Sequence, residues 1–112
     1  MSVLPLVATV NVTFDANGNG SVYIGPQVYG ETWDIKRISI STSSGPAATR
    51  FYLYLNTIQP SAQIDSTYSG DQDTSETNIH LQTLDKVYGS WTNGVVGAVG
   101  TMVVTGTKNT GR

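Results

Sequence analysis

The chain has no cysteine, a single histidine (His80), and charged residues at only 12% of its 112 positions. Nucleophilic and acid–base catalysis depend on a positioned Ser, Cys, His, Lys or carboxylate next to a group that activates it. One imidazole and no thiol leave few such arrangements open. The composition therefore predicts a protein that is not an enzyme, that uses no cofactor, and that acts through its surface.

Clustered charge is also lacking, since six Lys and Arg residues stand against eight Asp and Glu for a formal net charge of −2. Nucleic-acid binding draws on clustered Lys and Arg, so we expect no nucleic-acid partner. No apolar run approaches the roughly 20 residues of a membrane-spanning helix, and the start of the chain lacks a signal-peptide pattern. These absences predict synthesis in a reducing cytoplasm and no membrane partner.

What the sequence does have is apolar residues at every second position, which is the period of a β-strand. Residues 6–14 and 50–56 alternate in this way. In residues 32–42 the alternation slips near Lys36 and Arg37, which predicts a β-bulge. No window reads as an amphipathic helix. The pattern predicts an all-β chain that forms a single-domain antiparallel β-sandwich or jelly roll.

Turn residues divide these strands. The Asn-Gly pairs between Asp15 and Gly20 predict a hairpin that joins residues 6–14 to residues 21–24. The polar residues 59–78 predict a long loop, with at most a short strand at Gln63-Ile64. We expect three regions: an extended N-terminal arm at residues 1–9, the sandwich at residues 10–108, and a C-terminal tail at residues 109–112.

Two groups of acidic residues could hold calcium. The D-x-N-x-N-G run from Asp15 to Gly20 matches the first half of a calcium loop, but Pro26 stands where the bidentate Glu is required. The second group is Asp65, Asp71, Asp73 and Glu76. We interpret the first as a turn and the second as a solvated loop, so we predict no metal site. His80 lies between two apolar neighbours in a predicted strand, which places it on the opposite face, toward solvent or an interface.

Aromatic residues are the remaining candidates for recognition. They are Tyr23, Tyr29, Tyr52, Tyr54, Tyr68, Tyr88, Trp33 and Trp91. They could form a platform for sugar or protein, although aromatics in a small sandwich mostly serve the core and cross-strand pairs. We predict these inward-facing positions: Trp33, Phe51, Leu53, Leu55, Trp91 and Val103.

Three segments carry a resemblance to a known class of protein. They are residues 29–38 (YGETWDIKRI), residues 64–75 (IDSTYSGDQDTS), and the ending from Trp91-Thr92-Asn93-Gly94 through residues 97–101 (GAVGT). In these segments the chain resembles small virion proteins of tailed phages that infect actinobacteria, over roughly residues 12 to 107. The resemblance implies a capsid decoration (cementing) protein or a minor tail component.

The resemblance implies a virion location, with the major capsid protein or other virion subunits as partners and a homotrimer or other homo-oligomer as the assembled form. The alternative is a minor tail or tail-tip protein with a module that binds host-surface glycan. The predicted assembly interface consists of Val3, Leu4 and Leu6 in the arm, Tyr52 and Tyr54 on a strand, and Asp71 and Asp73 in the acidic loop.

Overall fold

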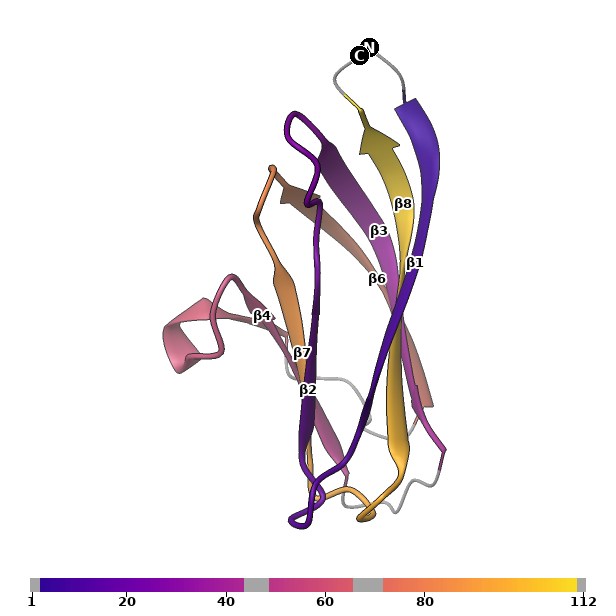
Figure 1. The fold of residues 1–112 in the computed structure, drawn as a ribbon, viewed down its shortest axis with the longest axis vertical. Helices are drawn as coiled ribbons and strands as arrows, with labels where there is room; N and C mark the ends of the chain where they lie inside the picture. The colour runs from indigo at the N-terminus through magenta and orange to yellow at the C-terminus, as the bar shows by residue number, and fades with distance from the viewer. Residues whose placement is uncertain (1–2, 44–48, 66–71, 111–112) are drawn as a thin grey trace.

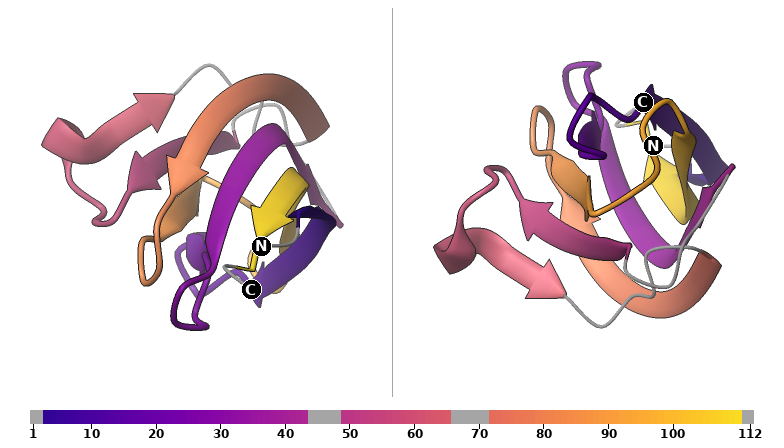
Figure 2. Two further views of the ribbon diagram at one scale, coloured as in Figure 1. Left: turned by 90° about the horizontal axis from the view of Figure 1, so that it is seen from above. Right: turned by 90° about the horizontal axis from the view of Figure 1, so that it is seen from below.

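The computed structural model describes residues 3–43, 49–65 and 72–110. In this part of the chain, eight strands form two sheets that pack face to face (Figures 1 and 2). Their bounds are β1 (Val3–Thr13), β2 (Gly20–Ile24), β3 (Thr32–Thr42), β4 (Arg50–Leu55), β5 (Gln63–Asp65), β6 (Gln72–Leu81), β7 (Val87–Thr92) and β8 (Val99–Asn109), with a short 3-10 turn, η1 (Pro60–Ala62), before β5. No helix in these residues is long and apolar enough to span a bilayer.

The strand order confirms the predicted sandwich. Sheet A runs β1-β8-β3-β6 and sheet B runs β2-β7-β4-β5, and all the neighbouring strands are antiparallel. The chain passes from one sheet to the other at every connection except the one between β4 and β5. Eight strands wound in this order form a jelly roll.

The predicted hairpin at Asp15 to Gly20 is wrong, because β1 belongs to sheet A and β2 to sheet B. The apolar faces of these two strands meet across the core, so the turn between them connects sheet A to sheet B. The Asp15 carboxylate stabilises this turn by accepting the backbone N–H groups of Asn17 (2.8 Å) and Asn19 (3.0 Å). The hydrogen bond from Asn19, followed by that from Asn17, lowers the pKa of Asp15 below its ordinary value of 3.8.

The predicted arm is also wrong, because residues 3–9 are the first half of β1. This strand pairs with β8 along its whole length, from Val3 opposite Asn109 to Thr13 opposite Val99. Leu6 is buried in the core at 4% exposure. The strand lies at the edge of sheet A, where Pro5 is tolerated because an edge strand has one side without a partner.

Residues 59–78, predicted as a loop, instead contain β5 and most of β6. The expected short strand at Gln63-Ile64 is confirmed as part of β5. Sequence periodicity missed the first part of β6 because it is polar: Thr74 and Asn78 are exposed on an edge strand, which needs no alternating apolar residues at these positions.

The predicted β-bulge is confirmed, since the register of β3 shifts between Ile35 and Arg37 against both of its neighbours. The extra residue returns the next apolar side chains to the inner face. As a result Ile35 and Ile38 are both fully buried, although an unbroken strand would turn them to opposite faces.

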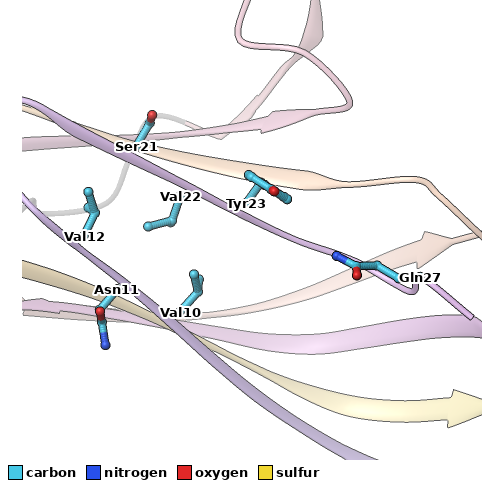
Figure 3. Close-up of a pocket in the computed structure, with 7 residues that line it drawn as sticks. All are labelled: Val10, Asn11, Val12, Ser21, Val22, Tyr23 and Gln27. Atoms are coloured by element: carbon cyan, nitrogen blue, oxygen red, sulfur yellow. The ribbon is translucent and has the colours of Figure 1, made fainter.

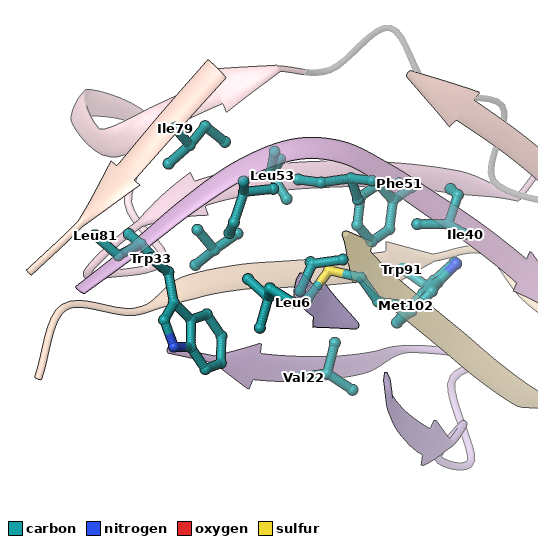
Figure 4. Packing of buried hydrophobic residues seen from close by; sticks show 14 of the residues in the cluster. Leu6, Val22, Trp33, Ile40, Phe51, Leu53, Ile79, Leu81, Trp91 and Met102 are labelled. Atoms are coloured by element: carbon teal, nitrogen blue, oxygen red, sulfur yellow. The ribbon is translucent and has the colours of Figure 1, made fainter. Parts of the chain in front are cut away.

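The core between the sheets is built from aromatic and aliphatic side chains of both layers (Figure 4). Trp91 lies at its centre, with its ring centroid 4.8 Å from that of Phe51 and 5.9 Å from that of Phe14. The inward positions predicted at Trp33, Phe51, Leu53 and Trp91 are confirmed.

Two of the residues predicted to face inward are not buried in the core. Leu55 is 37% exposed, because β4 ends there and the chain turns away at Asn56, which has a positive φ of 66°. Val103 faces the outer surface, since its neighbours Met102 and Val104 are the fully buried residues of β8. The residues at positions 102–104 are all apolar, so their sequence fits either phase of the strand and does not show which side chains face the core.

Candidate interaction surface

The predicted interface residues are spread over three parts of the molecule. Val3 and Leu4 are exposed on β1, at 65% and 43%. Leu6, in contrast, faces the core and is therefore removed from the interface. Tyr52 and Tyr54 lie half-buried on the outer face of sheet B. The structure does not bring the β1 residues and these tyrosines onto one face, since β1 belongs to sheet A.

The acidic interface residues cannot be placed as a cluster. Asp71 lies outside the described residues, and Asp73 is a β6 residue opposite Ile40. Glu76, four residues after the start of β6, forms an ion pair with Arg37 at 3.1 Å on the outer surface of sheet A. Within residues 3–43, 49–65 and 72–110, no three His, Asp or Glu side chains gather as metal ligands do.

The outer face of sheet B carries a group of four tyrosines, which we call the tyrosine patch: Tyr23, Tyr52, Tyr54 and Tyr88. Tyr88 stands between Tyr23 of β2 and Tyr54 of β4 in the strand register. The rings of Tyr23 and Tyr88 are 5.6 Å apart between centroids. Tyr52 lies two residues before Tyr54 and so faces the same way. Three adjacent strands thus present a row of phenol rings.

A positively charged side chain and a shallow hollow lie next to the tyrosine patch. The Lys86 ammonium lies 5.8 Å from the centre of the Tyr23 ring, within cation–π range. A hollow of about 190 Å³ borders the patch where Ser21 and Ser90 meet the exposed side chain of Ile58. Rings, hydroxyls and an aliphatic side chain beside a shallow hollow are features of a surface that binds another molecule.

A second hollow, of about 350 Å³, lies on a different part of the molecule, around the segment between β2 and β3. Its lining is Tyr29, Gly30, Thr32, His80, Gln82 and Thr83. Tyr29 is 94% exposed. The segment that carries it is held in place by Thr83, whose hydroxyl accepts the Gly30 N–H (3.1 Å) and donates to the Glu31 carbonyl (2.9 Å).

His80 lies at this second hollow, on the outer face of β6, opposite Asp34 in the register. This is the outward position that the sequence predicted. Its Nδ1 is 2.9 Å from Asp34 Oδ1, and both side chains are about half exposed, at 54% and 42%. The contact orients the imidazole, and its other ring nitrogen has no hydrogen-bond partner among the described residues.

Sequence reasoning found Tyr52 and Tyr54 but did not join Tyr23 and Tyr88 to them. All four were candidates for an aromatic platform, and each lies at an outward position of an alternating strand. What groups them is the pairing of β7 with both β2 and β4, strands that are distant in the chain. Alternation gives the face of each strand but not its neighbours.

Comparison with known proteins assigns the chain to no family. No protein-family model matches the chain, and no curated protein matches its sequence. Among solved structures, latent dimeric PorU from Porphyromonas gingivalis matches with a TM-score of 0.42 and 11% identity over 98% of this chain and 13% of that chain. A family two carbohydrate esterase from Cellvibrio japonicus gives a TM-score of 0.29 and 12% identity over 90% of this chain and 34% of that chain. Similarity at this level does not indicate a shared function.

Proposed function

We propose that the chain is a non-enzymatic structural protein of a tailed-phage virion that decorates the capsid exterior. In this proposal the tyrosine patch docks onto the major capsid protein or another virion subunit. The observation that carries the proposal is the row of tyrosines across three strands. Tyrosine is enriched at protein interfaces because its ring buries a large apolar area while its hydroxyl still forms hydrogen bonds.

The fold supports the proposal by analogy. Jelly rolls occur in viral capsid proteins and in lectins, but a fold hosts many functions, so the site has to carry the argument. The resemblance of the sequence to phage virion proteins points the same way. A homotrimer or other homo-oligomer on the shell is part of this proposal.

Location in the particle is the first test. Virions of the phage that encodes the chain are purified, labelled with an antibody against it and observed by electron microscopy. We expect the antibody to bind the head. Label confined to the tail would contradict capsid decoration and favour the tail alternative. Particles without label would contradict both locations.

A single substitution tests the tyrosine patch. Tyr88→Thr keeps a residue that favours strands but removes the central ring, and it should weaken binding to particles stripped of the protein by about tenfold or more. The matched control is Thr105→Val on the outer face of sheet A, which should bind as the wild type does. Equal affinities for Tyr88→Thr and the wild type, with unchanged melting temperatures, would show that docking uses another surface.

A second candidate function is a minor tail protein that binds host-surface glycan, and the hollow beside Tyr29 is the observation that favours it. Sugar rings stack their C–H faces on exposed aromatic rings, while their hydroxyls pair with planar polar groups. Tyr29 supplies the ring, and His80 and Gln82 supply the polar groups. Thr83 holds the segment in place before any ligand arrives, which lowers the entropy lost on binding.

This candidate predicts that the chain binds an array of bacterial surface polysaccharides and that Tyr29→Ala abolishes the binding. The control Tyr52→Ala, on the tyrosine patch, should leave the array signal unchanged. Tyr29 makes almost no contact with the rest of the protein, so its removal should not alter the melting temperature. An array without signal for the wild type would contradict glycan binding.

A further inference from the structure

The free edge of β1 differs from the other sheet edges. Among the described residues the four edge strands are β1 and β6 in sheet A and β2 and β5 in sheet B. β2 and β5 have only five and three residues. β6 carries charged side chains, among them Glu76. β1 has eleven residues and no Lys, Arg, Asp or Glu. Long, uncharged edge strands are templates for pairing with another strand, which natural proteins normally block.

The hydrogen-bonding phase of β1 follows from one bond beyond its end. The backbone N–H of Phe14 donates to the carbonyl of Ala98 at 2.8 Å, and these two residues continue the β1–β8 register. Hydrogen-bonded pairs alternate along an antiparallel ladder. The even-numbered residues of β1 therefore bond to β8, and the odd-numbered residues point their N–H and C=O groups away from it.

Pro5 is consistent with this phase. It is odd-numbered, so its missing N–H costs the ladder to β8 nothing. The other N–H groups along this edge that have no strand partner within the described ranges belong to Val3, Val7, Thr9, Asn11 and Thr13.

The side chains and the space around this edge also suit an added strand. Val3 and Val7 are 65% and 72% exposed on the outer face. A hollow of about 400 Å³ lies where the two sheets part, between residues 10–12 of β1 and residues 21–23 of β2 (Figure 3). The close-up shows Val10 and Val12 directed toward β2, and Asn11 directed away from it.

We propose that a second copy of this chain adds its own β1 antiparallel to this edge, which joins two A sheets into one continuous sheet across a two-fold axis. Two identical strands can pair here because the N–H and C=O groups of the odd-numbered residues point away from β8 in both copies. An axis at Ala8 pairs Val3 with Thr13 and Val7 with Thr9 of the second copy, so that N–H and C=O groups face each other at these pairs. The exception is the carbonyl of Asn11, which faces Pro5 of the second copy and meets no N–H there. The absence of charge from β1 means that self-pairing brings no like charges together.

This inference goes beyond capsid decoration and uses a surface other than the tyrosine patch, so the two can fail separately. The proposed pairing also makes a dimer the smallest assembly of the chain. A trimer built from equivalent contacts around a threefold axis would require a different interface.

The test uses a single substitution that removes one free N–H. Thr9→Pro deletes an edge donor without touching the ladder to β8, and Pro5 already occupies an equivalent position. Sedimentation should show that wild type and the control Thr9→Val dimerise, and that Thr9→Pro dimerises at least about tenfold more weakly. The melting temperature of Thr9→Pro at low protein concentration reports whether the sandwich remains folded.

A second variant keeps the proposal testable if Thr9→Pro unfolds. The chain has no cysteine, so a single introduced thiol can form a disulfide only between copies. In the proposed register Ala8 faces Ala8 of the second copy as a non-hydrogen-bonded pair, with Cα atoms about 4.5 Å apart, within the range that a disulfide spans. Ala8→Cys should therefore cross-link under mild oxidation, and Asn78→Cys on β6 should not.

Three results would overturn the inference: a wild-type protein that sediments as a monomer or trimer, equal dimerisation of Thr9→Pro and Thr9→Val, or an Ala8→Cys protein that cross-links no faster than Asn78→Cys. Tyr88→Thr should dimerise normally whichever result is found for its binding to the shell. Loss of shell binding alone thus addresses the proposed function, and loss of dimerisation alone addresses the β1 edge.

Discussion

Leu53→Ala is expected to lower the free energy of unfolding by about 2 to 5 kcal/mol. Leu53 is 1% exposed at the centre of β4, where it lies opposite Gly89 of β7. The truncation removes buried methyl groups and leaves a cavity that packed strands on both sides cannot readily fill. Such a loss is a large share of the total stability of a small domain. Urea denaturation followed by tryptophan fluorescence measures it.

The matched control is Leu55→Ala, two residues along the same strand. Leu55 points in the same direction but is 37% exposed at the end of β4, so its truncation should cost clearly less. Similar losses for the two variants would show that Leu53 is less tightly packed than the structure indicates.

Gly106→Ala is the second large effect, with an expected loss of about 3 kcal/mol, at the upper end for overpacking. Gly106 lies in β8 opposite Ile35, beside the bulge of β3. A Cβ there would overlap the Asp34 carbonyl oxygen and lie 3.0 Å from the Lys36 nitrogen. These are backbone atoms and cannot rotate away, so the two strands would have to separate or the bulge would have to rearrange.

This effect is measured by comparing the thermal unfolding of Gly106→Ala with that of a control variant, Thr105→Val. Thr105 is the preceding residue of β8, and its side chain faces the outer surface, so its replacement should change stability by no more than about 0.5 kcal/mol. A Gly106→Ala protein as stable as the wild type would show that the bulge has room that the structure does not show.

The sequence predicted those elements whose alternation is strong. β4 alternates without a break, and the slip of phase at Lys36-Arg37 marked the bulge in β3. It failed where apolar residues are adjacent, as at Val103 and Val104, and where an edge strand is polar, as in the first half of β6. It also failed at the Asp15 turn, since Asn-Gly favours a tight turn but does not decide whether the strands on either side pair with each other or with others.

The candidate surface could be predicted only in part for the same reason. Outward tyrosines are visible in the pattern of residues 51–55, and Tyr52 and Tyr54 were found in this way. The contribution of Tyr23 and Tyr88 depends on strand order, which is set by packing across the whole chain. Leu6 was misplaced because exposure was inferred from its position near the start, whereas its spacing from Ala8 and Val10 already placed it on the apolar face of β1.

The central place of β8 in sheet A has a consequence for how the chain folds. β8 is the last strand in the sequence, and it is the strand that joins β1 to β3. During synthesis β1 must therefore remain without its partner until residues 99–109 have left the ribosome. Sheets built from such distant segments lose much chain entropy before contacts form, and domains of this kind fold over milliseconds to seconds. An apolar strand exposed for that time is prone to pair with another nascent chain, so the order of the strands makes slow, late folding a period of risk for aggregation.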